Sequence, residues 1–300
     1  MLSRIPALLI LLALTVSAEL QARDYKVAVR AHHGIESAFA AWQATVDELN
    51  KNIVEHTFTL VPIVSLPEIT EKGGQGQFDF VLTNPSSFVE LEQLYQARAL
   101  LTLNNKRANT SQTRFGSVIF THALNKDILK IDDLAGKKLM AVSESAFGGW
   151  RVAWLELLEQ GFDPLHELGE LSFGVTKTQT EVVFSVLKQK VDAGVVRTDQ
   201  LERMEAAGKI DMRYLRIINN KDIKGFPFFL STKLFPEWCF AAMKEIPDKV
   251  SDQVVKTLLA IKPDQGAARS GKYTGWVKAL DYTPVRELLR DLKVEPYHTQ

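Results

Sequence analysis

The sequence of 300 residues is poor in cysteine and has no excess of either charge. Its single cysteine, Cys239, cannot form an intrachain disulfide, so the fold must rely on a buried core. Lys plus Arg balance Asp plus Glu, with 36 of each, and no basic tract occurs. This balance argues against nucleic acid as a partner. After the N-terminal segment, no apolar run is long enough to cross a membrane.

The sequence also lacks the common catalytic and cofactor motifs. It contains no Gly-x-Ser-x-Gly, no His-Glu-x-x-His and no Gly-x-Gly-x-x-Gly motif. The pair His32-His33 has no Cys, Asp or Glu partners at the spacing of a metal site. We therefore expect no enzyme, no cofactor and no metal, although a triad assembled from distant residues stays open.

The N-terminus resembles a secretory signal. Arg4 precedes an apolar core at residues 5–16, which is within the range of a signal peptide and short for a membrane span. Small residues allow cleavage after Ala18 or Ala22, and we favour Ala22 because a strand pattern follows it. We expect a signal peptide at residues 1–22 and a periplasmic mature protein, with an uncleaved anchor as the alternative.

Strand and helix patterns alternate along the mature chain, which predicts an α/β fold of two lobes. Several predicted strands end in polar turns. These turns are His32-His33, the segment 83–87, the segment 143–149 and Arg197. In open α/β sheets, ligands bind at the carboxyl ends of the strands. We therefore expect these turns to surround one cleft.

The segment 143–149, Ser-Glu-Ser-Ala-Phe-Gly-Gly, is the most informative of these turns. It follows a short strand pattern and leads into a helix pattern that ends at Gly161. Backbone N–H groups at a helix start, short hydroxyls and glycine together favour an anion. An ordinary turn between a strand and a helix is the alternative.

The order of motifs resembles the phosphonate-binding (PhnD-like) family of periplasmic solute-binding proteins. The resemblance is greatest to the branch that forms the sensor domain of tetrathionate-sensor-type histidine kinases, and it covers residues 25–297. It rests on five segments, which are 79–85 (DFVLTNP), 145–150 (SAFGGW), 192–199 (DAGVVRTD), 235–238 (FPEW) and 281–285 (DYTPV).

This resemblance implies a type II periplasmic binding protein fold, with two α/β lobes around a ligand cleft. It implies lobe 1 at residues 23–115 and 225–300, and lobe 2 at residues 116–224. The implied ligand is a small oxyanion or phosphonate, and the implied partner is an ABC transporter permease or a membrane-bound histidine kinase. Thr178-Gln179 stand where related proteins often have a histidine, and Cys239 stands where the sensor branch usually has proline.

The residues expected at the ligand each have a structural alternative. Ser and Thr hydroxyls could merely cap helices, and Cys239 is either a small buried residue or a thiol that reacts with a sulfur compound. Arg197 either clamps an oxyanion or pairs with Asp199 or Glu202, and we expect few other fixed cations. The expected ligand-binding residues are His32, His33, Thr83, Asn84, Ser86, Ser143, Ser145, Phe147, Gly148, Thr178, Gln179 and Arg197.

Three functions stay open at this point. The first is a binding protein that feeds a transporter, and the second is the same fold as a sensor of sulfur oxyanions such as tetrathionate or thiosulfate. The third is an enzyme built on this fold that acts on a thiamine-precursor-like substrate. The sequence does not name the ligand.

Overall fold

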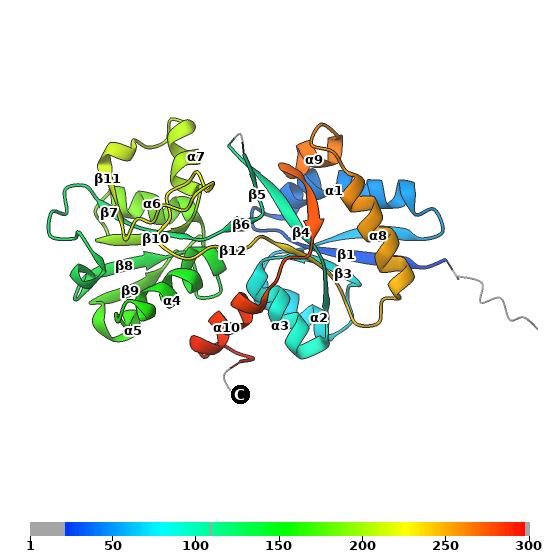
Figure 1. Ribbon diagram of the computed structural model, residues 1–300, viewed down its shortest axis with the longest axis horizontal. Helices are drawn as coiled ribbons and strands as arrows, with labels where there is room; N and C mark the ends of the chain where they lie inside the picture. Colours follow the sequence, from blue (N-terminus) through cyan, green and yellow to red (C-terminus); the bar gives the residue numbers. More distant parts are fainter. Residues whose placement is uncertain (1–21, 109, 298–300) are drawn as a thin grey trace, which may run out of the picture.

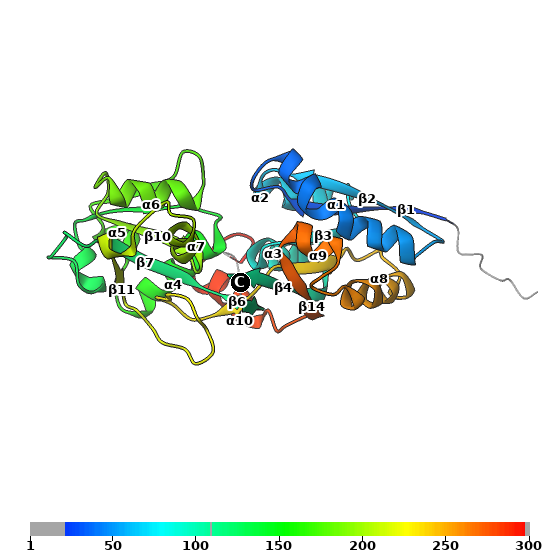
Figure 2. The same ribbon diagram turned by 90° about the horizontal axis from the view of Figure 1, so that it is seen from above.

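A computed structural model describes residues 22–108 and 110–297 and shows two α/β lobes side by side along the long axis (Figures 1 and 2). Residues 1–21 of the expected signal peptide lie outside the described residues. We call the unit around the larger sheet lobe 1 and the unit around the smaller sheet lobe 2.

Lobe 1 has a seven-stranded sheet of order β14-β4-β13-β3-β1-β2, with β5 paired to β4. β1 is parallel to β2 and β3, whereas β13 is antiparallel to β3 and β4. The strands are β1 (Asp24–Arg30), β2 (Thr57–Ile63), β3 (Phe80–Thr83), β4 (Arg98–Arg107), β5 (Thr110–Gln112), β13 (Cys239–Ala242) and β14 (Tyr273–Lys278). The helices are α1 (Ile35–Asn52), α2 (Leu66–Gly74), α3 (Pro85–Tyr95), α8 (Asp248–Ala260), α9 (Gly266–Gly271) and α10 (Thr283–Asp291).

Lobe 2 has a five-stranded sheet of order β11-β7-β10-β8-β9, and a hydrophobic cluster packs on each face. The strands are β7 (Ser117–His122), β8 (Lys138–Ala141), β9 (Glu170–Phe173), β10 (Ala193–Arg197) and β11 (Leu215–Ile218). The helices are α4 (Val152–Glu159), α5 (Pro164–Glu167), α6 (Gln179–Leu187) and α7 (Gln200–Ala206). A π-helical turn (Phe147–Arg151) precedes α4, and short 3-10 turns cover Ile131–Leu134 and Met212–Tyr214.

Local sequence signals explain where many of these helices begin. The side chain of Asn84 accepts a hydrogen bond from the N–H of Ser87 at 2.9 Å, and Pro85 is the first residue of α3. Thr178 caps α6 in the same way, by accepting from the N–H of Glu181 at 3.3 Å. Gly161 follows α4 with a positive φ of 82°, as the sequence predicted.

The C-terminal third forms the helices α8, α9 and α10, and it also supplies two strands to the large sheet. β13 lies between β3 and β4, and β14 forms one edge beside β4. β13 has four fully buried residues, so it shows no alternation of apolar and polar residues that would mark it as a strand. α10 begins at Thr283, with Tyr282 at the cap position and Pro284 in its first turn.

A short antiparallel pair joins the lobes, and we call it the hinge pair. It consists of β6 (Arg114–Phe115) and β12 (Phe235–Pro236), which lie between the two large sheets in Figure 1. The chain thus enters lobe 2 after β6 and returns through β12. Ser231 and Thr232, just before β12, still hydrogen-bond to β7. The lobe boundaries at 115/116 and 224/225 stay a prediction.

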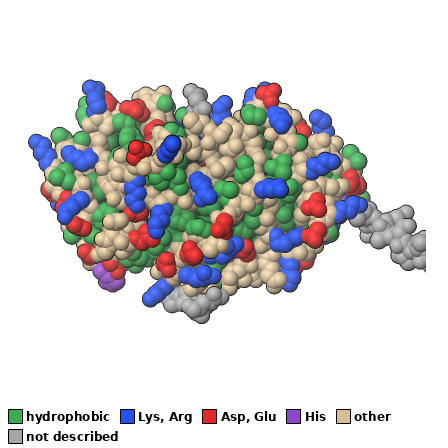
Figure 3. All heavy atoms as spheres, viewed as in Figure 1, with side chains coloured by type: hydrophobic (Ala, Val, Ile, Leu, Met, Phe, Trp, Pro, Cys, Tyr) green, Lys and Arg blue, Asp and Glu red, His purple; other side chains and the backbone are tan. Residues whose placement is uncertain are grey.

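Charges of both signs are interspersed over the face shown in Figure 3. Within residues 22–108 and 110–297, none of the helices combines the length and apolarity needed to span a bilayer.

Candidate functional site

The ends of β10 and of the π-helical turn meet at the hinge pair. The ring of Phe147 packs edge-on against Phe115 at 5.9 Å and Phe235 at 5.4 Å between centroids. A Cβ on Gly148 would lie 2.6 Å from a ring carbon of Phe115, so glycine is needed there for packing. In this conformation, Phe147 and Gly148 therefore fasten lobe 2 to the hinge, whereas we had expected both to face a ligand.

Arg197 lies at the end of β10, as expected, and its guanidinium faces the hinge. Its Nη2 donates to the carboxylate of Glu237, which is fully buried. The guanidinium carbon lies 4.1 Å from the centre of the Phe115 ring, a cation–π geometry. Burial lowers the pKa of Arg197. The negative charges of Glu237 and then Asp199 raise it by more, so the pKa is raised overall. The partner Glu237 is 40 residues away in sequence, and our alternatives had named only Asp199 and Glu202.

Arg197 belongs to a larger group that we call the arginine cluster, formed by Arg107, Arg197, Arg203, Asp199 and Glu237. Nε of Arg203 lies 2.6 Å from Asp199, Nε of Arg197 lies 3.4 Å from it, and Nε of Arg107 lies 3.6 Å from it. Three guanidiniums thus share two carboxylates, which leaves one net positive charge. The expectation of few other fixed cations is wrong.

The cluster draws on both lobes. Arg107 ends β4 of lobe 1, whereas Asp199 and Arg203 come from the start of α7 in lobe 2. Burial, followed by the charge of Arg197, lowers the pKa of Arg107 to about 10. Among the described residues, the buried Nε of Arg107 has no hydrogen-bond partner. A cationic N–H group that is buried without a partner can donate a hydrogen bond to an incoming anion.

His32 and His33 lie on the turn between β1 and α1. Their ring centroids are 4.1 Å apart, and His32 packs edge-on against Trp238 at 5.6 Å. Burial among protein atoms, followed by the charges of His33 and Arg30, lowers the pKa of His32 to about 3. Its side chain is nevertheless exposed to solvent. His32 is thus surrounded by protein atoms and still reached by solvent.

His33 relates this turn to the arginine cluster. Its pKa is lowered by burial first, then by the charges of Arg203 and Lys272. Arg203 belongs to lobe 2 and His33 to lobe 1, so the charge of Arg203 acts on His33 from the other lobe. The histidine turn and the cluster therefore form one electropositive region.

The turn at 83–87 is more enclosed than expected. Asn84 is occupied as the cap of α3, as in our structural alternative. The hydroxyl of Ser86 accepts from Arg151 of lobe 2 and donates to Glu90 at 3.2 Å. Arg151 also pairs with Glu90 at 2.8 Å, so this turn carries an ion pair between the lobes. The hydroxyl of Thr83 is buried without a partner among the described residues.

Ser143 and Ser145 are half-buried and precede the π-helical turn. The N–H groups at the start of such a turn have no acceptor within the helix, which suits an anion. Thr178 caps α6, and the side chain of Gln179 accepts from the N–H of Arg197 at 3.0 Å. Gln179 therefore holds the strand end that carries Arg197.

Sequence reasoning did not select Arg107, Asp199, Arg203, Glu237 or Trp238 as site residues. Two of the quoted segments, 192–199 and 235–238, contain three of them, so a signal was present. Arg107 and Arg203 stood in segments without a recognisable motif. Cys239 is fully buried, and burial raises the pKa of its thiol, which favours the small buried residue over a reactive thiol.

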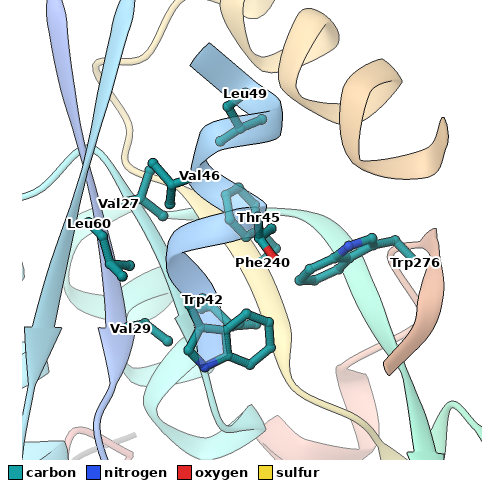
Figure 4. A pocket seen from close by; sticks show the side chains of 10 residues that line it. Val27, Val29, Trp42, Thr45, Val46, Leu49, Leu60, Phe240 and Trp276 are labelled. Atoms are coloured by element: carbon teal, nitrogen blue, oxygen red, sulfur yellow. The ribbon is translucent and has the colours of Figure 1, made fainter. Parts of the chain in front are cut away.

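A small void in the core of lobe 1 does not suit a ligand. It has a volume of about 10 Å³ and is lined mostly by apolar side chains from α1, β1, β2, β3, β13 and β14 (Figure 4). Trp42 and Trp276 form part of its wall in this view. This volume corresponds to about one water molecule, so we regard the void as a packing defect.

Comparisons with known proteins agree with the resemblance. Residues 34–283 match a family model described as the periplasmic substrate-binding protein of a phosphonate ABC transporter. A tetrathionate sensor histidine kinase from Salmonella typhimurium is 29% identical over 277 residues, which are 92% of this chain and 45% of that protein. The chain therefore spans less than half of that relative.

Solved structures support the fold alone. PhnD1 from Prochlorococcus marinus, in complex with methylphosphonate, has a TM-score of 0.67 at 14% identity. The alignment covers 90% of this chain and 98% of that one. The aliphatic sulphonate-binding protein of Escherichia coli has a TM-score of 0.54 at 12% identity and covers 90% and 86%. The fold is thus that of a type II periplasmic binding protein, as the sequence predicted.

Proposed function

Because the chain belongs to the phosphonate-binding family of periplasmic substrate-binding proteins, we propose that it captures a small oxyanion or phosphonate-like ligand between its lobes. The arginine cluster is the observation that carries this proposal. Three guanidiniums and two carboxylates leave one positive charge, in a region that both lobes build. An anion bound there gains charge-assisted hydrogen bonds from more than one donor.

The strand-end turns supply the rest of the proposed site. Ser143 and Ser145 offer hydroxyls and adjoining N–H groups from lobe 2, and His32 and His33 adjoin the cluster from lobe 1. His32 stays neutral above a pH of about 3, so at neutral pH it can donate one hydrogen bond without adding charge. The site thus combines fixed charge with neutral donors, which favours an anion that has several oxygen atoms.

The mature protein is proposed to act in the periplasm after cleavage near Ala22, and to present its ligand to a membrane partner. The partner is either an ABC transporter permease or a sensor histidine kinase. The relative from Salmonella typhimurium supports the sensor, whereas the family model supports the transporter. Neighbouring genes distinguish the two, since permease and ATPase genes indicate transport, and kinase and regulator genes indicate sensing.

A thermal-shift screen of the mature protein against oxyanions of sulfur, phosphorus, selenium and arsenic tests the binding function. We expect at least one oxyanion to raise the melting temperature, because a ligand that binds only the folded state stabilises it. Calorimetry on Ser145→Ala then tests the site. This variant is expected to lose about 0.5–1.5 kcal/mol of affinity, the net contribution of one hydrogen bond.

Ser111→Ala is the matched control, because Ser111 is exposed on β5. Normal affinity in Ser145→Ala would remove this turn from the site. A screen in which no oxyanion changes the melting temperature would contradict the proposed function itself.

A further inference from the structure

Lobe 1 carries a second electropositive feature, which we call the basic hollow. It has a volume of about 320 Å³ and lies where β4 meets α9 and the start of β14. Figure 2 labels α9, β4 and β14 next to one another at this place. Its wall contains Lys106, Arg269 and Lys272, with Pro263, Ala268 and Tyr273 beside them. This volume is at the lower end of the range for small-molecule sites.

The charges of the hollow are not neutralised by the protein. Within the described ranges, Lys106, Arg269 and Lys272 form no ion pair, and no carboxylate lines the hollow. The guanidinium of Arg269 donates to the backbone carbonyl of Asp264. The arginine cluster differs in this respect, because each of its guanidiniums lies near a carboxylate. Three cations without counter-charges in one concave surface favour an anion with more than one charge.

The shape of the hollow is fixed by its surroundings. The N–H of Lys106 donates to the carbonyl of Lys272 at 3.1 Å, which joins β4 to the residue that follows α9. The ring of Tyr273 is buried, and its hydroxyl is hydrogen-bonded to Thr45 at 2.9 Å. A Cβ on Gly271 would lie 2.5 Å from the Tyr273 ring, so the end of α9 packs directly on it. An anion would therefore enter a hollow that is already formed.

The hollow differs from the arginine cluster in its position on β4. Lys106 and Arg107 are consecutive residues of this strand, so their side chains point to opposite faces of the sheet. Arg107 reaches the cluster between the lobes, and Lys106 lines the hollow. Lys272 lies near enough to His33 to act on its charge, so the hollow adjoins the outer part of the electropositive region.

We propose that the basic hollow is a second site of lobe 1, which binds a small polyanion with phosphate, sulfate or carboxylate groups. Pro263 and Ala108, which are exposed in the lining beside the cations, give the ligand an apolar surface to contact. The site does not depend on the ligand between the lobes, because its lining residues all belong to lobe 1.

Calorimetry with inorganic tripolyphosphate at low salt tests this site in the mature protein. The double variant Lys106→Gln/Lys272→Gln is expected to bind the probe at least tenfold more weakly than the unaltered protein. Lys249→Gln/Lys256→Gln is the matched control, since it removes the same charge from exposed positions of α8. The control is expected to bind within about twofold of the unaltered protein. All four lysines are exposed, so the melting temperature checks that folding is unchanged.

Arg197→Lys distinguishes the hollow from the site between the lobes. Probe binding that persists in Arg197→Lys and is lost in Lys106→Gln/Lys272→Gln supports the hollow. Loss in Arg197→Lys alone would assign the probe to the arginine cluster and overturn the proposal. Equal weakening in the two lysine pairs, or no binding by the unaltered protein, would overturn it as well.

Discussion

Replacing Glu237 by glutamine removes one charge from the arginine cluster and leaves the size of the side chain nearly unchanged. Glu237 is fully buried, and the side chain of Arg197 is 13% exposed. Asn105 donates to the same carboxylate at 2.9 Å, and a glutamine oxygen can still accept that bond. The glutamine NH2 cannot accept the bond that the N–H of Trp238 donates to the other oxygen at 3.1 Å, so the substitution removes the charge and one acceptor of Glu237.

The expected loss of stability in Glu237→Gln follows from the burial of the Arg197–Glu237 ion pair. Removing one partner of a buried ion pair costs about 3–5 kcal/mol, because the other charge stays buried without compensation. Arg197 keeps Asp199 at 3.4 Å and the Phe115 ring at 4.1 Å, so we expect the lower end, about 3 kcal/mol. For domains of this size, 1 kcal/mol shifts the melting temperature by about 2–4 °C. The expected decrease in melting temperature is therefore roughly 6–12 °C.

A thermal melt of Glu237→Gln beside the unaltered protein measures this loss. Glu245→Gln is the control, because Glu245 is exposed in a turn on lobe 1 and is expected to change little. A decrease of less than about 2 °C would refute the view that Glu237 compensates a buried guanidinium.

Arg197→Lys completes the test by comparing stability with affinity. A lysine cannot contact Glu237, Asp199 and the Phe115 face at once, so we expect a lower melting temperature. If Arg197 also holds the oxyanion, affinity per folded molecule falls by about 1.5–3 kcal/mol. Unchanged affinity would leave Arg197 a purely structural residue of the hinge.

Three further predictions follow from individual contacts. Gly148→Ala is expected to lower stability by about 1–3 kcal/mol, because its Cβ meets Phe115, whereas Gly266→Ala has open space and should not destabilise in denaturant titrations. Glu90→Gln leaves Arg151 unpaired between the lobes, so a lower melting temperature is expected, and small-angle scattering should show more widely separated lobes. The pKa of His32 is about 3 in the folded chain, below its ordinary value. As the pH decreases, the unfolded chain therefore takes up a proton at His32 before the folded chain does. Stability should fall as the pH decreases from about 6.5 towards 3, and His32→Asn should flatten that dependence in melts across this range.

Local patterns in the sequence were sufficient for most helices of both lobes. The apolar spacing of Ile35, Phe39, Trp42, Val46 and Leu49 indicates α1, although the structure buries only the last three and leaves Ile35 and Phe39 exposed. Asn84-Pro85 likewise marks the start of α3, because an Asn cap and a proline in the first turn act within a few residues. Such signals depend on neighbours in the chain, so no tertiary structure is needed to recognise them.

The partners within the site could not be predicted in the same way. Arg197 meets Glu237 across 40 residues, and Arg151 meets Ser86 across 65. Both contacts depend on how the hinge pair and the interlobe surface align, which no local pattern encodes. The segments that contain Arg197 and Glu237 were among those on which the family resemblance rested. The resemblance did not show that these two residues bind each other.

The excess charge of the cluster gives a physical reason to couple ligand binding to the arrangement of the lobes. Three guanidiniums near two carboxylates repel one another when no anion is present, and burial strengthens that repulsion. An oxyanion that binds there supplies negative charge where the protein has too little, and its oxygens can accept from both lobes at once. The same charge that lowers the stability of the empty protein would then favour the conformation in which Arg107 of lobe 1 and Arg203 of lobe 2 are drawn together around the ligand.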